Sequence, residues 1–169
     1  MPYMNTVMTW EVISTDSADT EKLGELLASN IKAPLVIELR SDLGGGKTTF
    51  VRGLVRGLGS KDKVSSPTFT LQKIYHAKKD TEIHHFDFYR LSEAGVVAEE
   101  LAESLSDPNV ITAVEWSDIV KDVLPEQRLS IEFSPTSNDS EERKISIHYA
   151  ESLSGVIKQA ETKWVELQP

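Results

Sequence analysis

The sequence predicts an α/β sandwich, and three features of the chain support that fold class. Short apolar runs typical of strands alternate with longer segments whose apolar residues recur at helical spacing. A glycine-rich loop lies between an apolar run at Leu35–Leu39 and an amphipathic segment that begins at Phe50. Two late runs, Leu129–Phe133 and Lys144–Tyr149, flank the polar loop Ser134–Glu142 and predict a hairpin. We therefore expect a mixed sheet whose last strands are antiparallel.

The first third of the chain alternates strands and helices around the glycine-rich loop. Val7–Ser14 is a predicted strand, and Ser17 is the predicted N-cap of the helix that follows, because a serine hydroxyl can accept from a free N–H of the first turn. The apolar residues of this helix recur at helical spacing: Leu23, Leu26, Leu27 and Ile31. The strand Leu35–Leu39 then leads through the loop into a helix that runs to about Leu58 and ends at Gly59.

The rest of the chain continues the alternation. Strands are predicted at Thr68–Tyr75, Glu82–Phe88 and Val110–Glu115. Helices are predicted at Glu93–Leu105, at Ser117–Val123 and from Leu153 to about Val165. The helix at Glu93–Leu105 has one apolar face, formed by Val96, Val97, Leu101 and Leu105, and Asp107-Pro108-Asn109 closes it.

Length and composition predict a single soluble domain over residues 1–169. No apolar run approaches the roughly 20 residues that span a bilayer, and the N-terminus lacks the basic start of a signal peptide. The chain has no cysteine, which excludes a disulfide framework and a thiolate metal site. We therefore expect a cytoplasmic protein without a membrane contact.

The net charge of −9 argues against a protein that binds DNA or RNA by itself, since affinity for a phosphate backbone comes from clustered basic residues. The charge is unevenly distributed. Eight basic residues and one acid lie between Lys47 and Lys79, whereas sixteen acids and three basic residues lie between Asp80 and Glu142. These segments are either two solvated faces or a basic half that attracts nucleotide or RNA and an acidic half that meets a partner.

The loop between Leu39 and Phe50 reads R-S-D-L-G-G-G-K-T-T and has the strand, loop and helix order of a phosphate-binding P-loop. Backbone N–H groups of Gly44, Gly45 and Gly46 can wrap a phosphate, and the following helix directs its positive end to the same place. Lys47 adds a mobile charge for the outer phosphates, and the Thr48 hydroxyl is a candidate magnesium ligand. The general pattern places a glycine where this chain has Ser41.

Two predicted strands end in an acid, as hydrolysis at a P-loop requires. Val110–Glu115 is an apolar strand that ends at Glu115, and the strand before it ends close to Asp87. Either carboxylate could hold magnesium or orient water, or serve only as a helix cap or turn residue. The presence of both in a chain with a P-loop favours the functional interpretation.

Two further segments have both a functional and a structural interpretation. Ser65–Thr70 follows the P-loop helix, at the position where GTPases keep a threonine that senses the third phosphate, and it is otherwise a plain turn. His84 and His85 are adjacent, so on a strand they face opposite sides and cannot easily share a metal. We interpret both histidines as structural.

Four segments, SDLGGGKTTF, SSPTFTL, HHFDFYRL and AVEW, resemble in order and separation the TsaE family, bacterial ATPases required for threonylcarbamoyladenosine in transfer RNA. The similarity covers roughly Ser17–Phe133. It implies a three-layer P-loop NTPase-like sandwich with a mixed, partly parallel sheet, and a protein that assists TsaB and TsaD. The chain departs from the usual family loop, G-D-L-G-A-G-K-T-T, at Ser41 and Gly45. It also lacks the leucine-glycine and acidic-aromatic pairs that the family commonly shows after HFDFYRL.

The resemblance also implies roles for individual residues. Residues 44–49, Gly44, Gly45, Gly46, Lys47, Thr48 and Thr49, would hold the phosphates of ATP. Thr48 and Glu115 would bind Mg²⁺, and Asp87 would be a required acid beside them, so the expected catalytic residues are Lys47, Asp87 and Glu115. Thr68 would lie near the γ-phosphate, Trp116 beside the site, and the segment Asp16–Thr20, with Asp16 and Thr20 at its ends, near the adenine.

Three functions remain open on the sequence. The first is an ATPase whose turnover drives or resets a modification complex that reaches transfer RNA through its other subunits. The second is a nucleotide-gated binding module with little turnover. The third is a small-molecule kinase, which normally brings an arginine-rich lid, whereas Arg90 and Arg128 are isolated among acids. A GTPase is disfavoured because the chain contains no N-K-x-D segment to read guanine.

Overall fold

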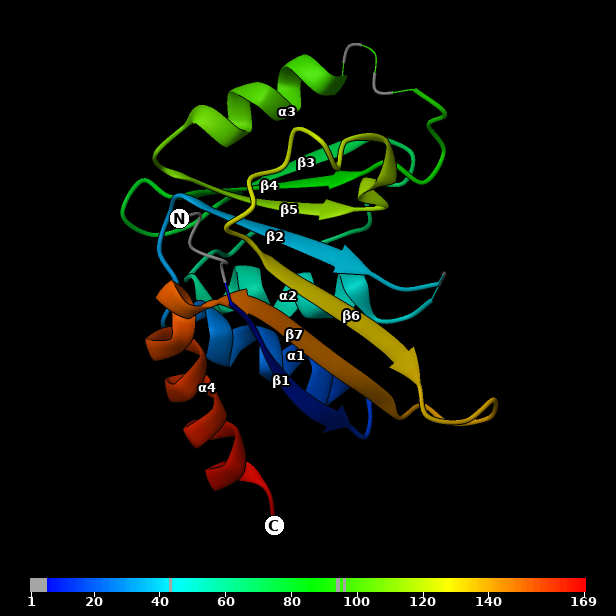
Figure 1. The fold of residues 1–169 in the computed structure, drawn as a ribbon, viewed down its shortest axis with the longest axis vertical. Helices are drawn as coiled ribbons and strands as arrows, with labels where there is room; N and C mark the ends of the chain where they lie inside the picture. The colour runs from blue at the N-terminus through cyan, green and yellow to red at the C-terminus, as the bar shows by residue number, and fades with distance from the viewer. Residues whose placement is uncertain (1–5, 43, 94, 96) are drawn as a thin grey trace.

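The computed structural model describes residues 6–42, 44–93, 95 and 97–169, and its strands form one mixed sheet (Figure 1). The strands are β1 (Val7–Ser14), β2 (Leu35–Arg40), β3 (Gln72–His76), β4 (Glu82–Asp87), β5 (Val110–Glu115), β6 (Leu129–Pro135) and β7 (Arg143–Ala150). Their order across the sheet is β1-β7-β6-β2-β5-β4-β3. The central strands β6, β2, β5 and β4 are parallel neighbours, and the pairs β1–β7, β6–β7 and β3–β4 are antiparallel. The mixed sheet and the antiparallel hairpin β6–β7 are therefore confirmed.

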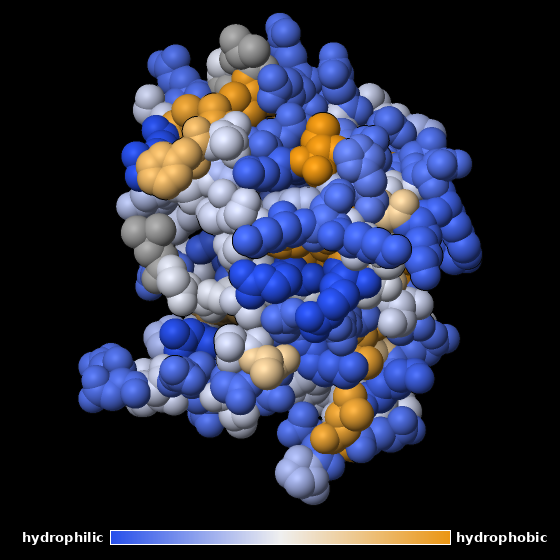
Figure 2. All heavy atoms as spheres, turned by 180° about the vertical axis from the view of Figure 1, so that it is seen from behind, coloured by the Kyte–Doolittle hydropathy of each residue, from blue (hydrophilic) through white to orange (hydrophobic). Residues whose placement is uncertain are grey.

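Helices cover both faces of this sheet, which gives three layers (Figure 1). The helices are α1 (Ser17–Ala28), α2 (Lys47–Gly57), α3 (Val97–Ser106) and α4 (Ser154–Leu167), with short 3-10 turns at Ser117–Ile119 and Glu151–Leu153. One core joins the sheet to α1, α2 and α4, and a smaller core joins β4, β5 and part of β2 to α3. Helices α1 and α2 lie behind the sheet in the view of Figure 1. The molecule seen from that side has a mostly hydrophilic surface with small separated apolar areas (Figure 2).

Helices α1 and α2 cross so closely that glycine is required at the contact. A Cβ added to Gly53 would lie 1.8 Å from the carbonyl oxygen of Glu21, and one on Gly24 would lie 2.4 Å from that of Phe50. Arg56 pairs with the carboxylate of Glu25 on the exposed side of the same contact. The close crossing fixes the first turn of α2, and with it the end of the glycine-rich loop, against the N-terminus of α1.

Several predicted boundaries are wrong for local reasons. The N-cap of α1 is Asp16 instead of Ser17, because the Asp16 side chain accepts from the N–H of Asp19. The helix ends at Ala28, so Ile31 packs in the core from the following turn. The expected strand Thr68–Tyr75 begins only at Gln72, because Thr70 and Leu71 both donate their N–H groups to the carbonyl of Pro67 in a turn.

Two predicted helices are shorter than expected. Helix α3 begins at Val97 instead of Glu93, and Val96 of its expected apolar face lies outside the described residues, as do residues 1–5 of the N-terminal segment. The expected helix Ser117–Val123 is a 3-10 turn at Ser117–Ile119 followed by further turns. In the described part of the chain, no helix has the length and apolarity to cross a membrane.

Candidate functional site

The glycine-rich loop joins the carboxyl end of β2 to the first turn of α2, and this connection places Lys47 beneath the loop. Lys47 is only 6% exposed. Its Nζ donates to the Ser41 hydroxyl at 2.8 Å and to the carbonyls of Ser41 and Asp42 at 3.3 and 3.2 Å. Burial lowers the pKa of the Lys47 ammonium, and the nearby carboxylates of Glu115 and Asp87 oppose that shift. The ammonium is thus held in a pocket of oxygen acceptors next to two acids.

The three glycines of the loop are needed for different reasons. Gly44 and Gly46 have φ angles of +74° and +103°, in the region that glycine adopts at little cost. Gly46 is the residue before α2, so its conformation turns the chain into the helix. Gly45 has no positive φ but lies against the side chain of Ser41. This backbone presents the N-terminus of α2 to the loop, which is the geometry of an anion site.

Two carboxylates lie side by side at the carboxyl edge of the sheet. Asp87 ends β4 and Glu115 ends β5, and the two residues are direct partners in the parallel pair. Asp87 accepts a hydrogen bond from the Thr68 hydroxyl at 2.8 Å and one from the N–H of Tyr89 at 2.9 Å. The structure therefore brings both predicted acids together with Thr68 of the loop Ser65–Thr70. They meet at the edge of the sheet where β5 lies next to β2.

His85, which we interpreted from the sequence as structural, is a buried contact of Glu115. It is fully buried, and its Nε2 lies 2.8 Å from Glu115 Oε1. A carboxylate only accepts, so Nε2 carries the proton of this hydrogen bond. Among the described residues its Nδ1 is the one buried side-chain polar atom without a partner. His85 thus fixes Glu115 through Oε1.

The Trp116 ring lies over the ammonium of Lys47. The Lys47 Nζ lies 4.9 Å from the Trp116 ring centroid, within the range of a cation–π contact. The Tyr89 ring packs against Trp116 at a centroid distance of 4.9 Å. Trp116 has a φ of +55°, an unfavourable conformation for a large residue, so its position depends on the contacts around it.

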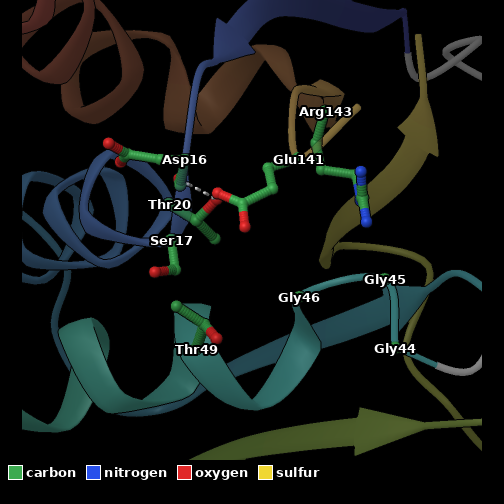
Figure 3. A pocket seen from close by; sticks show the side chains of 9 residues that line it. All are labelled: Asp16, Ser17, Thr20, Gly44, Gly45, Gly46, Thr49, Glu141 and Arg143. Atoms are coloured by element: carbon green, nitrogen blue, oxygen red, sulfur yellow. Dashed lines mark hydrogen bonds between the residues drawn. The ribbon is translucent and has the colours of Figure 1, made fainter. Parts of the chain in front are cut away.

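A cavity of about 210 Å³ opens between the start of α1 and the glycine-rich loop (Figure 3). The residues that line it are Asp16, Ser17, Thr20, Gly44, Gly45, Gly46, Thr49, Glu141 and Arg143. Asp16 and Thr20 thus lie across a hollow from the loop. Glu141 and Arg143 come from the segment around the start of β7, far away in the sequence, and no motif indicated them.

A third buried acid, Glu38, supports the chain next to Trp116. Its carboxylate accepts from Arg128 Nε at 2.9 Å, from Arg40 Nη2 at 2.9 Å and from the hydroxyl of Ser117. Burial alone would raise the pKa of Glu38, but these hydrogen bonds hold it at about 2. Because Ser117 directly follows Trp116, the network ties the conformation of Trp116 to the middle of β2.

We expect Glu38→Gln to destabilise the fold in a pH-dependent way. The folded pKa of about 2 lies below the ordinary value of 4.5, so the carboxylate stabilises the fold above about pH 5 and loses this effect as pH falls toward 2. The variant should lose up to about 3 kcal/mol of unfolding free energy at pH 7, and less at pH 3. Urea unfolding at both pH values measures this, with the exposed Glu132→Gln as the control. An equal loss at pH 3 and pH 7 would contradict the ionic role of Glu38.

The chain is similar in sequence to proteins named TsaE. A family model described as threonylcarbamoyl adenosine biosynthesis protein TsaE matches residues 14–145. The protein named tRNA threonylcarbamoyladenosine biosynthesis protein TsaE from Bacillus subtilis is 32% identical over 134 residues, which are 79% of this chain and 81% of that protein. The protein of the same name from Treponema pallidum is 32% identical over 119 residues, which are 70% of this chain and 87% of that protein.

The fold comparison agrees with the sequence comparison. The crystal structure of YdiB from Bacillus subtilis matches with a TM-score of 0.74 at 26% identity, and the match covers 94% of this chain and 97% of that one. The family match includes α1, the glycine-rich loop, both strand-end acids and the Glu38 network. On the matched residues and the shared fold, the chain belongs to the TsaE family.

Proposed function

We propose that this protein binds ATP with Mg²⁺ in the glycine-rich loop and hydrolyses it in the cytoplasm during threonylcarbamoyladenosine formation in transfer RNA. TsaB and TsaD are its proposed partners. The observation that carries the proposal is the position of the Lys47 ammonium, between the loop at the end of β2 and the adjacent carboxylates Asp87 and Glu115. The names of the relatives connect the family to the modification.

The proposed pose of ATP follows the arrangement of the loop and the neighbouring cavity. Backbone N–H groups of residues 44–49 would bind the phosphates, and Lys47 would exchange its present oxygen acceptors for those of the outer phosphates. The adenine would lie toward Asp16 and Thr20, across the 210 Å³ cavity from the loop (Figure 3). Thr49 also lines this cavity and would contact the part of the nucleotide between phosphates and base.

Thr48 and Glu115 are the proposed protein ligands of Mg²⁺. Thr48 lies in the first turn of α2 and Glu115 at the end of β5. Two protein oxygens fit this ion, which commonly takes one or two side-chain ligands and completes its shell with phosphates and water. When bound, Mg²⁺ would offset charge on the phosphates. The hydrogen bond from His85 would hold the Glu115 carboxylate in one orientation for this contact.

Asp87 is the proposed residue that positions the attacking water. Its carboxylate is fixed by Thr68 and by the N–H of Tyr89. A fixed carboxylate beside the phosphates can accept a hydrogen bond from water and aim it at the outer phosphorus. Lys47 would neutralise charge that develops on the outer phosphate oxygens, and Trp116 would keep bulk water away from the ammonium.

Steady-state ATP hydrolysis by the purified chain, alone and with TsaB, TsaD and transfer RNA, tests the proposed function. We expect slow turnover alone and faster turnover in the assembly, because partners complete the positioning of water and charge. ATP binding without turnover in either condition would favour the nucleotide-gated binding module. A kinase is disfavoured because Arg128 is held by Glu38 and Arg90 stacks on Phe69, 4.4 Å from the ring centroid, so neither is available to a lid.

We expect the amount of TsaB and TsaD that co-purifies with this chain to depend on the nucleotide that the chain binds. Thr68 contacts Asp87 in the site, while the next residue, Phe69, is 82% exposed, so a phosphate that displaces Thr68 would also move an exposed aromatic side chain. Pull-downs in ATP, in ADP and without nucleotide measure this dependence. Equal recovery in all three would contradict a contact gated through the loop Ser65–Thr70.

Transfer RNA is proposed to reach this protein only through the assembly. Because the chain has a net charge of −9, it should bind free transfer RNA only weakly at physiological salt. The basic stretch Lys47–Lys79 could face RNA once other subunits hold it nearby, since local concentration then replaces intrinsic affinity. Tight binding of the isolated chain to transfer RNA would contradict this arrangement.

A further inference from the structure

The side chain of Ser41 lies inside the glycine-rich loop, at the position where the general P-loop pattern has glycine. Its hydroxyl accepts from Lys47 Nζ at 2.8 Å and donates to the carbonyl of Asp42 at 2.7 Å. An ammonium has three N–H donors, and the other two acceptors here are the backbone carbonyls of Ser41 and Asp42. The hydroxyl is therefore the one side-chain oxygen, among the described contacts, that holds Lys47 in place.

Gly45 is the residue that leaves room for this serine. A Cβ at position 45 would lie 2.2 Å from Ser41 Oγ and 2.5 Å from Ser41 Cβ. Rotation about the serine χ1 moves Oγ but leaves Cβ in place, so no rotamer of Ser41 relieves the second overlap. Gly44 differs, because a Cβ there would meet nothing within 4 Å. Position 45 thus requires glycine for space and not for its backbone angle.

We propose that Ser41 and Gly45 are a matched pair that positions Lys47, an inference that rests on the proposed nucleotide-binding function. Serine at 41 demands glycine at 45, because a Cβ at position 45 would overlap both side-chain atoms of Ser41. Ser41 acts as a positioning residue, since the phosphates of ATP must compete with its hydroxyl for Lys47. Without a side chain at position 41, the closest remaining contact of an alanine Cβ at position 45 is the Asp42 carbonyl oxygen at 3.1 Å, which a small shift of the loop relieves.

A double-mutant cycle in ATP affinity tests the pair, with calorimetry on the full chain as the measurement. Gly45→Ala should weaken ATP binding at least about tenfold, because the loop must shift away from its phosphate-binding shape. Ser41→Gly should change affinity by less than about fivefold, since release of Lys47 and added loop flexibility oppose each other. The double variant should stay within about threefold of Ser41→Gly. A double variant as weak as Gly45→Ala would overturn the proposal.

Ser41→Ala separates the hydroxyl from the Cβ of the serine. Alone, it should tighten ATP binding by about two- to fivefold, because one competitor for Lys47 is gone. Combined with Gly45→Ala, it should bind as weakly as Gly45→Ala alone, because the Cβ overlap of 2.5 Å remains. Unchanged affinity in the single variant would contradict the role of the hydroxyl, and rescue by the combination would contradict the role of the Cβ.

Urea unfolding without nucleotide distinguishes failure of this inference from failure of the proposed function. Gly45→Ala should be less stable than the parent, and Ser41→Gly should remove that loss in the double variant. If the coupling appears in unfolding while the parent chain binds no ATP, the steric pair stands and the nucleotide proposal fails. If the parent binds ATP and neither measurement shows coupling, the pair is wrong and the proposed function stands.

Discussion

Replacement of Lys47 by alanine is expected to weaken ATP binding by more than about tenfold and to abolish hydrolysis. The outer phosphates would lose their one mobile cation, and a lost charged hydrogen bond costs about 1.5 to 3 kcal/mol. The expected loss is large here because Lys47 is only 6% exposed, so little water replaces the ammonium. Calorimetric titration with ATP and Mg²⁺ measures the affinity, and phosphate release measures turnover.

The exposed Lys61, which follows α2, provides the matched control for this variant. Lys61→Ala removes the same charge from the surface, so it should leave ATP affinity within about twofold of the parent. The thermal unfolding of both variants should be compared, because Lys47 also donates to two backbone carbonyls of the loop. A folded Lys47→Ala protein with unchanged ATP affinity would remove the glycine-rich loop from the proposed site.

Asp87→Asn and Glu115→Gln are expected to lower turnover by at least about a hundredfold while ATP affinity changes little. Each carboxylate is proposed to act on water or on the metal, and neither contacts the base. Both replacements are nearly isosteric, and only the hydrogen bond between Thr68 and position 87 must reverse its direction, because the amide nitrogen of Asn donates. Asn can still accept from the N–H of Tyr89, and Gln can still accept from His85 Nε2. Single-turnover hydrolysis, together with calorimetric ATP affinities, separates the two effects.

Asp118 is a suitable control because it is exposed and lies three residues after Glu115. Asp118→Asn removes a charge close to the site but should leave turnover within about twofold of the parent. If Asp87→Asn and Glu115→Gln both hydrolyse ATP at the parent rate, the strand-end carboxylates are structural, and hydrolysis must be sought elsewhere or rejected.

The elements with strong periodic patterns were predictable, and those determined by single local contacts were not. The glycine-rich loop and the mostly apolar strand at Val110–Glu115 lie where expected, because their composition permits few other structures. The expected strand at Thr68–Tyr75 was wrong at its start, because the turn at Pro67 uses backbone hydrogen bonds that residue type alone does not specify. The predicted N-cap of α1 was wrong by one residue, because Asp16 and Ser17 are both good caps and residue type alone does not choose between them.

The candidate site shows a similar division. The positions of Asp87 and Glu115 were predictable because each ends a strand that leads toward the loop. His85 and Glu38 each had an overlooked signal. His85 lies two residues before Asp87, on the same side of the strand, and Glu38 is a charge inside an apolar strand. Glu141 had no such signal, because its place in the cavity depends on how the β6–β7 loop bends back toward α1 (Figure 3).

Formation of threonylcarbamoyladenosine in a reconstituted mixture tests whether ATP hydrolysis at this site is needed for the modification. The mixture contains this chain, TsaB, TsaD, transfer RNA and the remaining substrates, and mass spectrometry of the digested RNA measures the modified nucleoside. With the parent chain we expect many modified RNA molecules per complex, and with Glu115→Gln, which should bind ATP without hydrolysing it, at least about tenfold fewer. Equal yields with the parent and with Glu115→Gln would contradict a role for ATP hydrolysis at this site in the modification.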